Sequence, residues 1–209
     1  MYKTPQEYFQ RLHFPRSRFS RTLEDTLLLL ANRIINIGIM DKSQFNELFD
    51  KTIKETTEGE VKEKSIKNKR TEMIKLFGLV KYDNSLAIPW SKLSILTQTQ
   101  DTPRFFKSFC NRFQFPGGFL KPDKVSEMVK NGVKFKPAKY ILRMFKVAIS
   151  KNGEFALNAA EATHFIFYDK RVTVNGEEPS VALDRILEAR KNNIKLDKTG
   201  DLIRYARDF

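Results

Sequence analysis

Residues 60–88 read EVKEKSIKNKRTEMIKLFGLVKYDNSLAI, and this stretch predicts a lysine-rich helix followed directly by a short β-hairpin. Apolar residues recur at the spacing of one helix face, at Ile66, Met73, Ile74 and Phe77. The opposite face carries cations, an amide and a hydroxyl, at Lys64, Asn68, Thr71 and Lys75. Gly78 is a candidate cap for this helix. Short apolar runs on both sides of Asp83-Asn84-Ser85 then predict the hairpin.

Two more helices are predicted before this stretch. The first spans Thr22–Ile37, with Thr22 as its N-cap and Gly38 at its end. The second begins at Asp41 and is broken by the segment Thr56-Thr57-Glu58-Gly59. Three helices followed by a hairpin is the order of a winged helix-turn-helix domain. We therefore expect a mainly α fold with small β-hairpin wings, in the α+β class.

The remainder of the chain is predicted to be mostly helical. Ser91–Asp101 is expected to be a linker or loop, and Gln114–Phe119 a turn in which Gly117 and Gly118 permit positive φ. Helices are expected at 103–113, 123–132, 137–149, 157–168, 179–192 and 199–209, with an edge strand or loop at 172–175. A helix that begins at Thr199 and stops uncapped at Phe209 indicates the front part of a longer protein.

These patterns divide the chain into four expected segments. They are a basic N-terminal arm (1–21), a winged-helix subdomain (22–90), a linking subdomain (91–136) and a helical subdomain (137–209) that would be an incomplete winged helix. Two interpretations of the arm are open. Its aromatic residues pack onto the core, or its cations Arg16, Arg18 and Arg21 lie against DNA, as basic N-terminal arms do.

The chain of 209 residues carries a formal net charge of +13. Cations gather in residues 1–21, 61–81 and 121–151, which together hold more positive charge than the whole chain, so the remainder is net acidic. Clustered positive charge of this kind fits a polyanionic partner. A single cysteine excludes an intrachain disulfide and favours a reducing compartment. Because no apolar run near the start is long enough for a signal peptide or membrane span, we expect a cytoplasmic protein without a membrane partner.

Catalytic chemistry finds little support in the residues. Asp50 followed by Glu60-Val61-Lys62 nominally matches the acidic residue and Glu-x-Lys of Mg²⁺-dependent nucleases, but the segment is polar and reads as a solvated helix start. His164 lies between apolar residues and is expected to be packed or capping. Cys110, between Phe109 and Phe113, is expected to be a small core residue rather than a reactive thiol. No metal-ligand spacing is present, so no metal site is expected.

Four segments carry a resemblance to a known family. They are TPQEYF (4–9), DKSQF (41–45), KRTEMIKLFG (69–78) and FFKSFCNRFQFPGGFLKPDKV (105–125). With them the chain resembles the N-terminal DNA-recognition domain family of the type IIS restriction endonuclease BpuJI, closely over residues 1–150 and more by helical order beyond. The resemblance implies tandem winged helix-turn-helix subdomains with a linking subdomain, an architecture related to the recognition part of FokI.

The resemblance further implies sequence-specific binding of double-stranded DNA at a short asymmetric site, read through the major groove. The DNA-binding residues would be Arg16, Arg18 and Arg21 in the arm and Lys64, Lys67, Asn68, Lys69, Arg70, Thr71 and Lys75 on the recognition helix. Arg and Asn suit base edges, and Lys suits phosphates. On an ideal wheel Arg70 falls on the apolar side, so its side chain would reach around toward phosphate.

This recognition module would be non-catalytic, monomeric and free of cofactors. Mg²⁺ is expected for a separate C-terminal nuclease domain of the parent restriction endonuclease. Three alternatives stay open: a winged-helix transcription regulator, a small Mg²⁺-dependent nuclease that uses Asp50, Glu60 and Lys62, and an RNA-binding protein. A regulator would normally dimerise on a palindrome, whereas the chain shows no long heptad helix for dimerisation.

Overall fold

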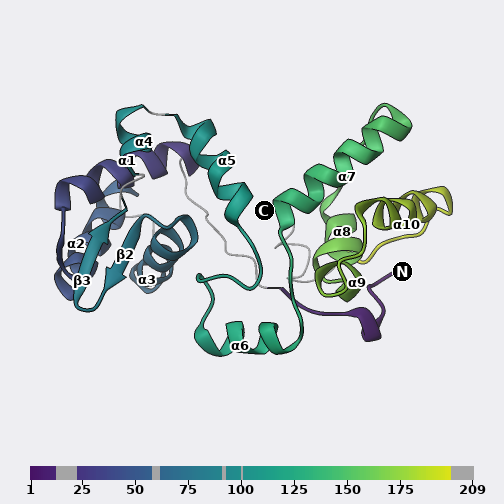
Figure 1. The fold of residues 1–209 in the computed structure, drawn as a ribbon, viewed down its shortest axis with the longest axis horizontal. Coiled ribbons are helices and arrows are strands. Elements are labelled where there is room, and N and C mark those ends of the chain that lie inside the picture. The colour runs from purple at the N-terminus through teal and green to yellow at the C-terminus, as the bar shows by residue number, and fades with distance from the viewer. Residues whose placement is uncertain (13–22, 58–61, 91–92, 100, 199–209) are drawn as a thin grey trace. The chain divides into compact units, whose positions relative to one another are not determined.

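The computed structural model describes residues 1–12, 23–57, 62–90, 93–99 and 101–198. The chain divides into two compact units (Figure 1). Ser17–Phe109 form one of them, called here the helix–hairpin unit, and Met1–Arg16 together with Cys110–Phe209 form the other, called the helical unit. The described residues are mainly helical, with one small antiparallel sheet, which confirms the expected α+β class.

The helix–hairpin unit follows the order helix, strand, helix, helix, hairpin, and then two further helices. Its elements are α1 (Leu23–Ile37), β1 (Met40–Asp41), α2 (Lys42–Thr56), α3 (Glu63–Thr71), the π-helical turn η2 (Glu72–Leu76), β2 (Val80–Asp83), β3 (Leu86–Pro89), α4 (Leu93–Gln98) and α5 (Thr102–Arg112). The sheet order is β1-β3-β2, and both pairings are antiparallel. The short strand β1, which the sequence did not predict, places Met40 opposite Ala87.

Local signals begin and end these elements where the sequence predicted. Asp41 caps α2, because its carboxylate accepts a hydrogen bond from the Ser43 backbone N–H at 2.7 Å. The hydroxyl of Ser43 donates to the same carboxylate and lowers the pKa of Asp41. Gly78 follows the α3–η2 stretch with a φ of +65°, a left-handed value that favours glycine. Asn84 takes a φ of +51° in the tight turn between β2 and β3.

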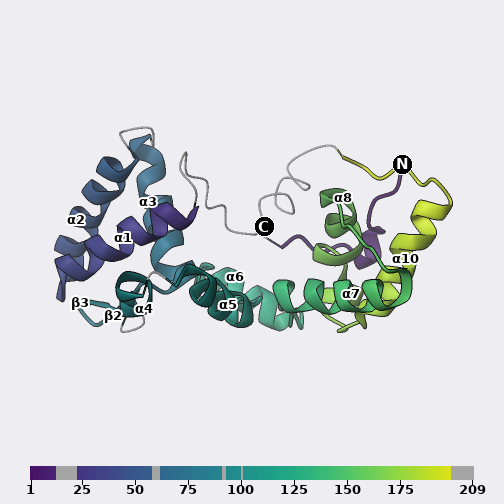
Figure 2. The ribbon, with the colours of Figure 1, turned by 90° about the horizontal axis from the view of Figure 1, so that it is seen from above.

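The core of the helix–hairpin unit draws one apolar face from each helix. Figures 1 and 2 show α1, α2 and α3 gathered together beside the hairpin. Fully buried side chains come from α1, α2 and the α3–η2 stretch, at Leu27, Leu30, Ile34, Phe45, Phe49, Ile53 and Met73. The ring of Phe77 packs against that of Phe109, with centroids 5.0 Å apart and planes tilted by 44°, and so joins α5 to this core. The four apolar positions that predicted the α3 face are all buried.

The expected linker at Ser91–Asp101 is wrong for most of its length. Residues Leu93–Gln98 form the helix α4, which packs on α1. Leu93 and Leu96 are fully buried, and their spacing of three residues places them on one helical face. Such a short apolar pair gives too weak a periodic signal to read from sequence, and burial against α1 is what stabilises the helix.

The helical unit contains α6 to α10 and the N-terminal segment. Its elements are the 3₁₀ turn η1 (Gln6–Tyr8), α6 (Pro122–Lys130), α7 (Pro137–Asn152), α8 (Ala159–Ala162), the π-helical turn η3 (Thr163–Phe167), α9 (Lys170–Thr173) and α10 (Pro179–Lys191). Helices α7 and α10 pack side by side (Figure 1). The edge strand or loop expected at 172–175 is wrong for Val172 and Thr173, which belong to α9, whereas residues 174–175 form a turn. Asp169 caps α9, because its carboxylate accepts from the Arg171 N–H. The helix expected at 199–209 lies outside the described residues.

Residues 2–12 pack onto the rest of the helical unit, which begins at Cys110. Tyr2 stacks on Phe165 with ring centroids 4.9 Å apart, and Leu12 is fully buried. His164 is buried beside this segment, where its Nδ1 faces the Thr4 N–H at 3.4 Å and its Nε2 lies 2.9 Å from the Asp197 carbonyl oxygen. A carbonyl can only accept, so Nε2 carries the proton. His164 is therefore packed, as expected, and the first interpretation of the arm holds for its first twelve residues.

The turn at Gln114–Phe119 forms for a different reason from the expected one. Neither Gly117 nor Gly118 is among the described glycines with positive φ. A Cβ on Gly117 would instead lie 2.7 Å from the Gln114 carbonyl oxygen, so the close approach of the backbone requires glycine there. Phe115 leads into this turn and exchanges two backbone hydrogen bonds with Phe135, at 2.7 and 3.0 Å.

Candidate nucleic-acid interface

One face of the α3–η2 stretch presents polar side chains to solvent. Lys67, Asn68, Thr71 and Lys75 are all exposed there, opposite the buried Ile66 and Met73. The Thr71 hydroxyl donates to the Lys67 carbonyl oxygen at 2.9 Å, so its oxygen remains able to accept a hydrogen bond. The structure thus brings together two cations, an amide and a hydroxyl on one helical face, as the sequence predicted. These are the groups that contact phosphates and base edges in protein–DNA complexes.

Arg70 takes a different position from its neighbours. Its guanidinium Nη1 donates to the Asp50 carboxylate at 2.5 Å and to the Asn46 carbonyl oxygen at 3.1 Å. Both side chains of the ion pair are largely buried, with exposed fractions of 19% for Arg70 and 26% for Asp50. Arg70 therefore joins α3 to α2 in this structure, and a contact between Arg70 and DNA stays a prediction.

The same residues also hold the hairpin. Tyr82 on β2 donates its hydroxyl to the Asn46 side-chain oxygen at 2.8 Å, and the Lys42 ammonium lies 4.9 Å from the centre of the Tyr82 ring. Burial raises the pKa of Tyr82, so its hydroxyl stays a neutral donor at physiological pH. This network fixes the directions of α3 and of the hairpin relative to α2. Asn46, Tyr82 and Lys42 were missed by sequence reasoning, because they lie far from Arg70 in the sequence.

The remaining candidates are placed as follows. Lys69 is half-buried on α3, away from the exposed face. Lys64 belongs to α3, but its side chain lies outside the described residues, as do Arg16, Arg18 and Arg21 of the arm. The nuclease alternative named three residues. Asp50 is paired with Arg70, Lys62 is exposed, and Glu60 lies outside the described residues.

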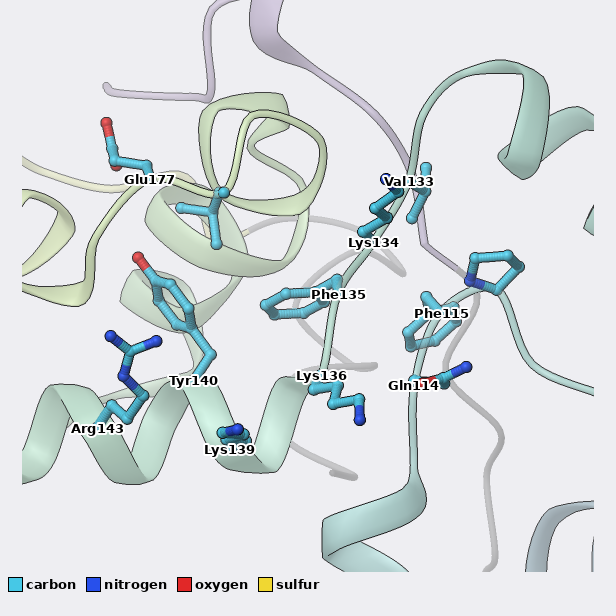
Figure 3. A pocket seen from close by; sticks show the side chains of 13 residues that line it. Gln114, Phe115, Val133, Lys134, Phe135, Lys136, Lys139, Tyr140, Arg143 and Glu177 are labelled. Atoms are coloured by element: carbon cyan, nitrogen blue, oxygen red, sulfur yellow. The ribbon is translucent and has the colours of Figure 1, made fainter.

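A second basic surface lies in the helical unit and was not assigned from sequence. A pocket of about 410 Å³ opens at the start of α7 (Figure 3). Its rim carries four cations, namely Lys134, Lys136, Lys139 and Arg143. The positive charge of residues 121–151 was the signal for it in the sequence, but charge alone does not show which lysines share a hollow.

Three further features bear on other possible functions, namely the thiol of Cys110, metal ligands and membrane-spanning helices. The Cys110 thiol is half-buried, and burial raises its pKa, which lowers its reactivity as expected. Among the described residues no three His, Cys, Asp or Glu side chains converge as metal ligands would. Within the same ranges, no helix combines the length and apolar character needed to cross a membrane.

An exposed helix face of cations and an amide, fixed to its neighbours by a buried ion pair and followed by a hairpin, defines a nucleic-acid-binding class of domain. The family model described as "Restriction endonuclease BpuJI - N terminal" matches residues 2–209. The chain therefore belongs to this family, as the four sequence segments indicated.

A solved structure supports the same assignment. The chain is similar to the BpuJ1 endonuclease binding domain, crystallised in complex with pyrene- and phenanthrene-modified DNA, with 28% sequence identity and a TM-score of 0.84. The match covers 98% of this chain and 76% of that chain. No curated protein sequence matches the chain.

Proposed function

We propose that this chain is the target-recognition module of a type II, IIS-like restriction endonuclease. In this role it binds double-stranded DNA in a sequence-specific manner and reads a short asymmetric site through the major groove. The helix–hairpin unit acts as a winged helix, with α3 as the recognition helix and β2–β3 as the wing. Membership in the BpuJI N-terminal family and the DNA complex of its structural relative support this proposal.

The observation that carries the proposal is the exposed face of α3. Asn68 offers a donor and an acceptor that suit adenine, and Lys67 and Lys75 flank it with charge for phosphates. The Arg70–Asp50 pair holds this face outward, because it anchors the opposite side of α3 to α2. A helix held in this way presents its side chains in one direction, as base reading requires.

The proposal also covers the N-terminal arm and the oligomeric state of the protein. Arg16, Arg18 and Arg21 lie against DNA, and the module binds as a monomer because its site is asymmetric. DNA binding by this chain needs no cofactor. In the parent endonuclease, a nuclease domain elsewhere supplies the Mg²⁺-dependent cleavage, and the protein acts in the cytoplasm.

Selection of bound duplexes from a randomised pool, without metal, tests the function. We expect an asymmetric motif of a few base pairs. A palindromic motif would instead indicate a dimeric transcription regulator, and preference for single strands would indicate RNA or single-stranded DNA binding. Retention of duplexes without any motif would contradict sequence-specific recognition.

A further inference from the structure

The pocket of the helical unit is built by two backbone connections. Phe115 and Phe135 exchange hydrogen bonds, which sets Gln114 and Pro116 opposite Lys134 and Lys136. The Lys134 N–H donates to the Thr173 carbonyl oxygen at 2.9 Å, which fixes this wall against α9. The concave shape therefore depends on main-chain contacts rather than on flexible side chains.

The charges at this pocket are unbalanced. The side chains of Lys134, Lys136 and Lys139 are exposed, and none has a carboxylate within 4 Å in the described part of the chain. One carboxylate, Glu177, also lines the pocket, where its Oε1 pairs with Arg185 and its Oε2 has no hydrogen-bond partner among the described residues. Glu178 pairs with Arg143 at 2.9 Å. In the view of Figure 3, Lys136 lies between Lys139 and Gln114.

Two neutral features add to the attraction for an anion. The pocket lies at the N-terminal end of α7, a helix of 16 residues, whose dipole favours negative charge there. Tyr140 lines the pocket, and its hydroxyl has no hydrogen-bond partner among the described residues. Burial raises the pKa of Tyr140, with Glu177 contributing, so the hydroxyl keeps its proton and is a donor.

From this geometry we infer that the pocket binds a phosphate group of the DNA backbone, through Lys136 and Lys139 with Lys134 beside them. This inference rests on the proposed function and adds a second contact surface to it, in the unit that does not contain α3. Lysines suit this task as point charges that follow a phosphate without reading sequence.

The test compares two double variants of the whole chain with equal loss of charge. Lys136→Gln with Lys139→Gln removes two pocket cations, and Lys151→Gln with Lys191→Gln removes two cations of the same unit outside the pocket. The dependence of duplex affinity on salt is measured for each by fluorescence anisotropy. We expect the logarithmic salt slope to fall by about one per pocket lysine and to stay near the unchanged value in the control. Circular dichroism melting checks that both variants fold.

A second arm separates the sources of phosphate. Inorganic phosphate is titrated into the unchanged chain and the pocket variant, and amide shifts of residues 134–143 are followed by NMR. We expect shifts in the unchanged chain that disappear in the variant. Suppose that the salt slopes are equal in both double variants, while phosphate still shifts residues 134–143 in the unchanged chain and not in the pocket variant. This result would overturn the assignment to the DNA backbone in favour of a small phosphate ester.

Equal slopes without such shifts would overturn the phosphate site itself. The proposed function fails separately. If the unchanged chain bound no duplex but still showed phosphate shifts at residues 134–143, DNA recognition would be rejected while the pocket remained a phosphate site.

Discussion

Arg70 on α3 and Asp50 on α2 form an ion pair with 2.5 Å between Nη1 and Oδ2, on the side of α3 that packs against α2. The pair places a charged residue of the lysine-rich stretch in a structural role, and its neighbours Lys67 and Asn68 keep the outward positions. One helix thus separates its polar residues into those that hold it and those that are free to meet a ligand.

Asp50→Ala should destabilise the helix–hairpin unit by about 1–3 kcal/mol, because it leaves the largely buried Arg70 guanidinium without its carboxylate. Urea unfolding followed by the fluorescence of Trp90, the one tryptophan of the chain, measures this unit. Asp83→Ala is the control, since its pair with Lys81 is exposed, and we expect a change within about 0.5 kcal/mol. Equal losses in the two variants would show that the Arg70 pair has no special role.

Lys75→Ala should weaken binding to every duplex alike. Because Lys75 is exposed on the same side as Asn68, its proposed partner is a phosphate, and losing one contact lowers the salt slope by about one. Lys54→Ala, which removes an exposed cation from α2, is the matched control. Affinities for the selected site and for random DNA are measured over a range of salt. A loss confined to the selected site would assign Lys75 to base reading.

Asn68→Ala should instead lower affinity for the selected site by about 1–3 kcal/mol and leave binding to random DNA nearly unchanged, because a bidentate contact to a base discriminates by that amount. Competition between the selected duplex and a scrambled one gives the ratio directly. Gln98→Ala, an exposed amide on α4, should leave the ratio unaltered. If both duplexes lost affinity equally, Asn68 would not be reading a base.

Tyr82→Phe should change the response of stability to alkaline pH. Burial raises the pKa of Tyr82, so the folded state keeps the phenolic proton at pH values where the unfolded chain, with a pKa near 10, begins to lose it. The stability contribution is therefore complete below about pH 10 and is lost as pH rises through the folded pKa. The free energy of unfolding, measured by Trp90 fluorescence between pH 8 and 11, should therefore decline less steeply with pH in the variant than in the unchanged chain. At pH 7 the substitution should lower the free energy of unfolding by about 1 kcal/mol, because the hydrogen bond to Asn46 is lost.

Leu12→Ala should destabilise the helical unit by about 2–5 kcal/mol, because the side chain is fully buried although it lies near the N-terminus. Circular dichroism melting and hydrogen exchange at residues 164–169 report on this unit. Met1→Ala, at a residue that is 77% exposed, should have little effect. Unchanged exchange in the Leu12 variant would mean that the N-terminal segment does not stabilise the unit.

The α3–η2 stretch and the hairpin after it could be predicted from sequence because their signals are local. The apolar spacing from Ile66 to Phe77, the cap at Asp41 and the positive φ at Gly78 each act within one or two turns of the chain. The exposed face of Lys67, Asn68, Thr71 and Lys75 follows from the same periodicity, since burying one helical face leaves the other in solvent.

Other features were decided by residues that meet only in the folded chain. Arg70 finds Asp50 across 20 positions, Thr4 finds His164 across 160, and Phe115 pairs with Phe135 to form the basic pocket. The short helix α4 depends on α1 in the same way. Helix periods and caps are properties of neighbouring residues, whereas the partner of a charge or the wall of a pocket depends on which distant segments pack together. For this reason the sequence sufficed for the exposed polar face of α3, and the tertiary structure was needed for the contacts that hold this helix and for the second basic surface.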